Sequence, residues 1–242
     1  LYSSAASDVY KRQINLLCKL TPQNPKFGVT GSNGKSTTTA LLAEMLRLAD
    51  PRTLVGGNLG NSLLCRADGL PSDVPIVLEF SSFMLAGMRV LRRSPQVAVV
   101  TNLSPNHLDW HGTLADYYKA KRAILDYQRR EDVAVLNADD EELVKWGARA
   151  RGRVIWVSLK RELEGDAAFL DGDKLVVRWD GLAEVVALRG DLRLPGRHNL
   201  ANALMAGAAA RAAGVRPGLI TEALAGFAGL PHRLEMVART PQ

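Results

Sequence analysis

One glycine-rich segment of the sequence has the residue types that a phosphate-binding loop needs. Residues 30–36 read TGSNGKS, with Lys35 and Ser36 directly after Gly34. A lysine in this place can reach the outer phosphates of a nucleotide, and the serine hydroxyl can bind Mg²⁺. The general pattern G-x-x-x-x-G-K-[ST] would put another glycine at position 29, where the sequence has Val29. The segment therefore predicts a nucleotide site with a loop that departs from the general one.

The elements on either side of this segment favour anion binding. Residues 26–30 are typical of a buried strand, and residues 36–48 have the apolar period of an amphipathic helix. Unpaired backbone N–H groups and the positive end of the helix dipole converge where such a helix begins. A chance GKS in a surface turn is the alternative, and the strand and helix disfavour it. The predicted nucleotide-binding residues of the loop are Gly31, Ser32, Asn33, Gly34, Lys35, Ser36 and Thr37.

Two further polar side chains follow apolar runs that are typical of buried strands. Glu79 ends the run Ile76–Glu79, and His107 follows the run Val97–Thr101 after a short loop. Ligands of open α/β sheets bind outside the carboxyl ends of the strands, so both side chains are expected beside the phosphate loop. A buried carboxylate is costly unless it meets a cation, which makes Mg²⁺ the natural partner of Glu79. The alternative is a carboxylate that caps the next helix. His111 is not assigned to the site.

Lys121 occupies a position where an apolar residue is expected. In the predicted helix 114–127 it lies four residues after Tyr117 and four before Leu125, inside an apolar stripe with Leu114, Tyr118 and Ile124. Burial lowers the pKa of a lysine and leaves a neutral, nucleophilic amine. The alternative is a lysine whose stem covers apolar surface while its ammonium group reaches water.

The remaining pattern predicts an α/β fold, a P-loop-type parallel sheet flanked by helices, with a small antiparallel β meander. Short apolar runs alternate with helical patterns, which is typical of a parallel sheet that is buried on both faces. The expected parallel strands are Lys26–Thr30, Thr53–Val55, Ile76–Glu79, Val97–Thr101, Val133–Asn137 and Val154–Val157. The expected meander is Phe169–Leu170, Lys174–Trp179 and Glu184–Leu188, followed by helices His198–Ala213 and Pro217–Phe227.

Composition limits the function classes. The chain has 242 residues, 47% of them hydrophobic and 23% charged, which is typical of one large globular domain. Its net charge is +6, but the basic residues are scattered, so we expect no nucleic-acid partner. No apolar run is long enough to predict membrane insertion, and two cysteines, Cys18 and Cys65, suit a reducing compartment. We expect a cytoplasmic monomer.

The sequence resembles the central ATP-binding domain of the Mur ligases and of the related folylpolyglutamate synthase, whose loops depart from the general pattern in the same way. The resemblance covers about residues 26–236. Within the family, GGNLG, LEFSSF and GLPHR most resemble the members that add D-glutamate to UDP-N-acetylmuramoyl-L-alanine, although Met84 stands where glutamine is usual. The motifs, in family order, are TGSNGKST at residues 30–37, GGNLG at 56–60, LEFSSF at 78–83, NLSPNHLDWHGT at 102–113, YYKAK at 117–121, LNADD at 136–140, GRHNLAN at 196–202 and GLPHRLE at 229–235.

The resemblance implies an ATP-dependent carboxylate-amine ligase of peptidoglycan precursor synthesis. It would use two Mg²⁺ ions and an acyl phosphate, with Lys35, Lys121 and His107 in catalytic roles. Ser36, Glu79, His107 and Lys121 would bind metal, with Lys121 carbamylated by CO₂. Asn202 matches the family's adenine contact, and Arg233 matches its contact to the nucleotide phosphates. Asn58 matches a contact to the muramoyl substrate. Asn199 shares a helix face with Asn202, where amides can read adenine or cap the helix, and Asn58 can equally be a turn asparagine.

The resemblance also predicts the domain organisation. Residues 1–13 are expected to be a disordered or non-native leader, 14–235 the Mur ligase central ATP-binding domain, and 236–242 the start of a linker to a further domain. The family's flanking domains bind the uridine nucleotide and deliver the amino acid, so we expect this chain to be inactive alone. The alternatives are a ligase of the family with another acceptor, and a nucleotide-binding domain without ligase chemistry.

Overall fold

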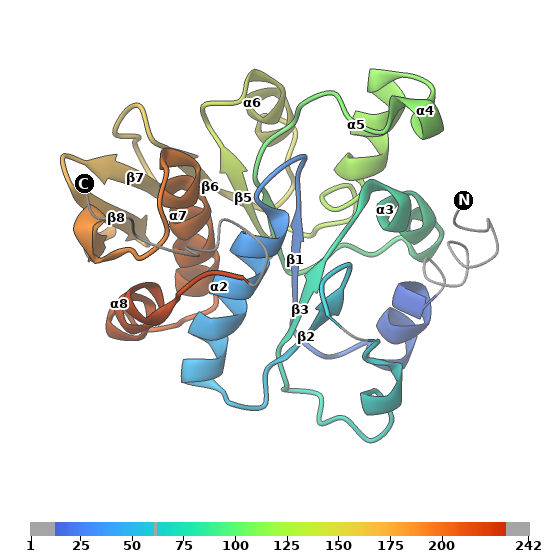
Figure 1. Ribbon diagram of the computed structural model, residues 1–242. Coiled ribbons are helices and arrows are strands. Elements are labelled where there is room, and N and C mark those ends of the chain that lie inside the picture. Colours follow the sequence, from blue (N-terminus) through green and yellow to red (C-terminus); the bar gives the residue numbers. More distant parts are fainter. Residues whose placement is uncertain (1–12, 61, 231–242) are drawn as a thin grey trace, which may run out of the picture.

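A computed structural model describes residues 13–60 and 62–230 (Figure 1). Its centre is a nine-stranded sheet, within the described residues, in the order β2-β3-β1-β4-β5-β6-β7-β8-β9. The strands are β1 Lys26–Thr30, β2 Leu54–Gly57, β3 Ile76–Glu79, β4 Val97–Val100, β5 Val133–Asn137, β6 Arg153–Ser158, β7 Ala167–Asp171, β8 Lys174–Trp179 and β9 Leu182–Leu188. The helices are residues 13–20, α2 Lys35–Ala49, α3 Ser82–Met88, α4 Leu108–His111, α5 Leu114–Arg122, α6 Glu141–Gly147, α7 Arg197–Ala212 and α8 Pro217–Gly226.

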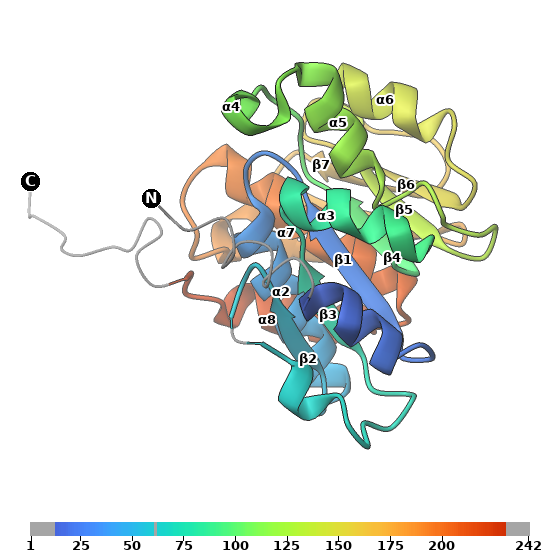
Figure 2. The same ribbon diagram turned by 90° about the vertical axis from the view of Figure 1, so that its right-hand side faces the viewer.

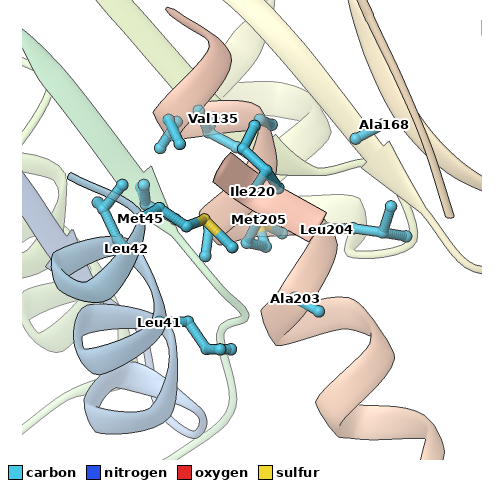
Figure 3. Packing of buried hydrophobic residues seen from close by; sticks show 14 of the residues in the cluster. Leu41, Leu42, Met45, Val135, Ala168, Ala203, Leu204, Met205 and Ile220 are labelled. Atoms are coloured by element: carbon cyan, nitrogen blue, oxygen red, sulfur yellow. The ribbon is translucent and has the colours of Figure 1, made fainter. Parts of the chain in front are cut away.

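Helices cover both faces of the sheet and bury two apolar cores. Alternate strand residues face opposite sides, so Val99 of β4 belongs to the core under α2, α7 and α8, and Val100 to the core under α3 and α6. Figure 3 shows Leu41 and Met45 of α2 on the side that faces α7, and Leu42 belongs to the same buried cluster as Met205 of α7 and Ile220 of α8. Full burial of one such side chain contributes about 1.5–3 kcal/mol. These contacts fix α2 against the sheet and thereby fix the loop that precedes it.

The predicted fold class is confirmed, and the structure adds how the last strands join the sheet. The meander continues the main sheet, because β7 pairs in parallel with β6, with Trp156 opposite Ala167. Strands β7, β8 and β9 are antiparallel to one another, as predicted. The sheet is therefore continuous, and the meander extends it away from the phosphate loop.

Helix α5 is shorter than the predicted helix 114–127. It ends at Arg122, and residues 123–127 form turns. Ser94 explains the end, because its Oγ donates to Ala123 O at 3.1 Å and accepts from Tyr127 N at 3.1 Å. The backbone N–H groups of residues 123–125 bond three residues back, which gives tight turns, and Tyr127 N bonds to the neighbouring loop. Leu114, which was expected on the buried face, is 36% exposed.

The carboxyl ends of β3, β1 and β4 lie next to one another. Val29 of β1 is opposite Glu79 of β3, and Thr30 is opposite Val100 of β4. The loop after β1 therefore begins between Glu79 and the end of β4, which is the place where open α/β sheets bind ligands. Figure 2 shows α3 and α5 beside each other near this edge. Among the helices of the described residues, none is long and apolar enough to cross a lipid bilayer.

Candidate active site

The loop between β1 and α2 depends on two glycines. Gly31 has φ 150° and Gly34 has φ 80°, both in the region that favours glycine. Gly34 also lies against α7, since a Cβ at this position would be 2.3 Å from Asn202 Oδ1. Helix α2 begins at Lys35, with no acidic residue in its first turn. The first N–H groups of a helix have no partner within it, so this end can bind an anion.

The predicted loop residues divide into two groups by their contacts. The backbone N–H groups of Ser32 and Asn33 donate to the backbone oxygen and Oδ1 of Asn102, at 2.8 and 3.0 Å. Lys35 Nζ donates to Ser32 O at 2.9 Å. Ser36 is buried at the start of α2 and Thr37 is half-buried. The anion-binding capacity therefore lies at the helix start, while Ser32 and Asn33 shape the loop.

Glu79 is held so that one carboxylate oxygen is left for a ligand. The residue is 1% exposed, and Asn58 Nδ2 donates to its Oε1 at 2.9 Å. Its Oε2 is buried and has no hydrogen-bond partner within residues 13–60 and 62–230. In the same residues no three His, Cys, Asp or Glu side chains converge. A buried carboxylate with a spare oxygen fits a cation, so Glu79 suits Mg²⁺. Sequence reasoning missed its bond to Asn58.

Lys121 is buried, as the helical pattern predicts. It is 2% exposed, which makes the alternative of an ammonium group in water wrong. Its Nζ donates to Gly31 O at 2.7 Å and lies 4.9 Å from the centre of the Tyr117 ring. Burial is the main cause that lowers the pKa of Lys121 to about 7; the Lys35 charge lowers it further and Glu79 opposes the shift. A large neutral fraction is thus available near neutral pH to react with an electrophile.

This pKa predicts how stability depends on pH. The pKa of Lys121 is about 7 in the folded chain against an ordinary value of 10.5, so between these values the unfolded chain binds more protons. The free energy of unfolding is therefore expected to rise between pH 7 and pH 10 relative to that of Lys121→Met. Urea titrations in CO₂-free buffer measure this difference. The exposed Lys119→Met, on the same helix, is the control and should follow the wild type; parallel curves for wild type and Lys121→Met would contradict the prediction.

His107 lies at the same edge, among aromatic rings. It is exposed, has the left-handed φ of 53° and precedes α4. Its ring centre is 5.1 Å from that of Phe83 and 6.4 Å from that of Tyr117. Tyr117 also contacts Lys121, so one ring lies beside both predicted metal ligands. A left-handed histidine is uncommon and is often found at functional sites.

His111, which the sequence analysis left out, belongs to the same aromatic cluster. Its Nε2 is 2.9 Å from Ser82 Oγ, and its ring stacks on Phe83 at 5.6 Å. Burial, followed by the nearby His107 and Lys121, lowers the pKa of His111. The only sequence signal for His111 was the second histidine of NHLDWH, and its spacing did not predict the contacts with Ser82 and Phe83.

Asn202, the predicted adenine contact, meets Asn199 beside the phosphate loop. Asn202 Nδ2 donates to Asn199 Oδ1 at 3.0 Å, and Thr38 Oγ1 donates to Asn202 Oδ1 at 3.3 Å. Asn199 Nδ2 in turn donates to Pro195 O. They line a cavity of about 280 Å³, close to the lower size of ligand pockets. Arg233 lies outside the described residues. The cavity is lined by Gly34, Thr37, Leu194, His198, Asn199, Asn202, Gly229 and Leu230.

Known proteins resemble this chain over most of its length. The family described as Mur ligase middle domain matches residues 29–210. A UDP-N-acetylmuramoylalanine–D-glutamate ligase from Symbiobacterium thermophilum is 44% identical over 214 residues, which cover 88% of this chain and 46% of the relative. One from Pelotomaculum thermopropionicum is 42% identical, covering 89% and 47%. The chain spans about half the length of the curated relatives it matches.

Solved structures agree with the fold. MurF from Acinetobacter baumannii aligns with a TM-score of 0.73 at 22% identity, over 97% of this chain and 53% of that protein. A ligase from Neisseria meningitides aligns with a TM-score of 0.68 at 24% identity, over 90% and 70%. At this identity the likeness shows the fold alone. The family match, by contrast, includes the phosphate loop, Glu79, Lys121 and Asn202, and the chain therefore belongs to the Mur ligase middle-domain family.

Proposed function

We propose that this chain is the ATP-binding part of a ligase that joins D-glutamate to UDP-N-acetylmuramoyl-L-alanine in peptidoglycan precursor synthesis. Mur ligases use ATP and Mg²⁺. The observation that carries the proposal is the meeting of an anion-binding helix start, a carboxylate with a spare oxygen and a buried lysine at one sheet edge. The relatives at 42–44% identity support D-glutamate as the amino acid.

The reaction has two displacements. A carboxylate oxygen of UDP-N-acetylmuramoyl-L-alanine attacks the γ-phosphorus of ATP, and ADP leaves. The amine nitrogen of D-glutamate then attacks the acyl carbon of this acyl phosphate, phosphate leaves, and the nitrogen loses a proton as the amide forms. Lys35 balances charge on the transferring phosphoryl group, and Asn202 with the adjoining cavity takes the adenine. Arg233 and Asn58 are proposed to contact the nucleotide phosphates and the muramoyl substrate.

Metal binding is assigned to four side chains. Ser36 and Glu79 would hold one Mg²⁺, and His107 with Lys121 would hold a second. The neutral Lys121 amine would attack the carbon of CO₂ and lose a proton, which turns a cation into a carbamate that can bind a metal. Bound Mg²⁺ supplies positive charge that neutralises the phosphate oxygens. Asn58 orients Glu79 through its 2.9 Å hydrogen bond, which leaves Oε2 for the ion.

A domain exchange tests the proposed function. Residues 26–230 would replace the matching segment of the S. thermophilum ligase, and amide formation would be measured with ATP, Mg²⁺, UDP-N-acetylmuramoyl-L-alanine and D-glutamate. We expect activity within about tenfold of the parent, because the segment carries the same ATP site.

The control is the same exchange into A. baumannii MurF, assayed with that ligase's own substrates. Comparing the two hosts distinguishes a general ability to support ATP-dependent ligation from a specific fit to the ligase that adds D-glutamate. Equal function in both would remove the support for D-glutamate, and no function in either would overturn the ligase assignment.

A further inference from the structure

We propose that residues Thr101–Ser104, here called the support loop, hold the phosphate loop in its binding shape, with Asn102 as the positioning residue. The support loop follows β4 and lies against the loop that follows β1. This inference rests on the proposed function, since it concerns how the ATP site is kept ready. Asn102 would act on ATP through Asn33, without touching it.

Asn102 forms hydrogen bonds to the backbone of the phosphate loop, as a neighbouring strand would. Its backbone oxygen accepts from Ser32 N at 2.8 Å, its Oδ1 accepts from Asn33 N at 3.0 Å, and its Nδ2 donates to Asn33 O at 3.0 Å. Both backbone groups of Asn33 are thus fixed by one amide side chain. A two-point contact of this kind sets the orientation of the peptide as well as its position.

Neighbouring residues of the support loop add to this contact. Thr101 Oγ1 donates to Asn33 O at 2.6 Å. Ser104 N donates to Ser32 Oγ at 2.8 Å, and Ser32 Oγ lies 2.9 Å from Ser104 O. Gly31 permits the close approach, because a Cβ there would be 1.9 Å from Thr101 Oγ1. The glycine thus serves the contact between the loops as well as the turn.

The support loop is itself anchored from the far side. Asp140 Oδ2 accepts from Leu103 N at 2.7 Å, while its Oδ1 accepts from the first N–H groups of α6. Asn137 Nδ2 donates to Thr101 O at 3.0 Å. Asn137 is the last residue of β5 and Asp140 is the N-cap of α6, so both anchors belong to elements of the α/β core. The phosphate loop is therefore tied through the support loop to a rigid element.

This arrangement accounts for a loop that has Val29 where the general pattern has glycine. Val29 belongs to β1 and is fully buried, so the turn begins only at Gly31. A loop that is already ordered loses less conformational entropy when a ligand binds. The hydrogen bonds from the support loop provide that order before the nucleotide arrives.

Asn102→Ala tests the inference, with three measurements on the chain. We expect the amide hydrogen of Asn33 to exchange with solvent roughly tenfold faster without nucleotide, because two hydrogen bonds are lost. We expect the Kd for Mg²⁺-ATP, measured by calorimetry, to rise roughly tenfold. Urea unfolding reports the accompanying loss of stability. If the alanine variant does not fold, Asn102→Ser removes the same two contacts and keeps a polar side chain.

The matched control is Asn24→Ala, which lies before the amino end of β1, at the opposite edge of the sheet from the phosphate loop. Asn24 also braces a turn with its amide, donating to Pro71 O at 2.8 Å and Val74 O at 3.0 Å. It should lower stability and leave the Kd for ATP unchanged. A wild-type chain that does not bind ATP would overturn the proposed function. A wild-type chain that binds ATP, with an unchanged Kd in the Asn102 variant, would overturn this inference alone.

Discussion

Lys35→Ala is expected to abolish the stabilisation of the chain by ATP. In the wild type, Mg²⁺-ATP at about 100 times its Kd should raise the free energy of unfolding by about 2.7 kcal/mol. Loss of a desolvated charge partner typically costs about 2–5 kcal/mol, so the variant should show no rise at the same ATP concentration. Lys35 is half-buried at the helix start, and its Nζ is turned back onto Ser32 O, so the fold does not depend on it as a core residue.

Urea unfolding with and without Mg²⁺-ATP measures this effect, and the variant without ATP shows whether the fold persists. Lys174→Ala, an exposed lysine on β8, serves as the charge-matched control and should respond to ATP like the wild type. An unaltered ATP response in Lys35→Ala would exclude this loop as the phosphate site.

Lys121→Ala is expected to lower amide synthesis by at least about 10²–10³-fold in the ligase that carries this segment. The variant loses the nitrogen on which a carbamate would form and leaves a buried cavity beside Gly31 O and the Tyr117 ring. Initial rates of phosphate release with product formation measure the loss. Bicarbonate should raise the rate of the wild type and should not affect the variant.

Short carboxylic acids distinguish a carbamate from a purely structural lysine. Acetate or formate can enter the cavity of Lys121→Ala and restore a carboxylate, so partial recovery of the rate is expected. Lys121→Met fills the cavity and serves as the control that should show no recovery. If neither bicarbonate nor the acids change the rate, Lys121 acts as an amine or as a packing residue.

Local patterns predicted the parts of the site that follow directly from single elements. The phosphate loop, Glu79 at the end of β3 and the buried Lys121 each depend on a short stretch of sequence, because strand ends and helix faces follow from residue spacing. The alternation of apolar strands and helices along the sequence was sufficient to predict that these three groups lie at one edge of a parallel sheet.

Contacts between distant segments could not be predicted in the same way. The hydrogen bonds of Asn102 to Asn33 and of Asn58 to Glu79 join different loops, and an amide side chain can form such bonds in many turns. The parallel pairing of β7 with β6 was missed because the Asp-Gly turns specify only the hairpins that follow. The end of α5 depends on Ser94, which lies in another segment.

The position of β1 has a consequence for when the site can form during protein synthesis. Its two neighbours, β3 and β4, leave the ribosome much later than β1 does, since Lys26 pairs with Ile76 and Phe27 with Val97. Until β4 has been made, one side of β1 has no strand to pair with, and Thr101 and Asn102 cannot reach the loop. Lys121 follows later still. Asn199 and Asn202, which line the adenine cavity, follow last, so a nucleotide bound to the complete site can assist folding only after they have emerged.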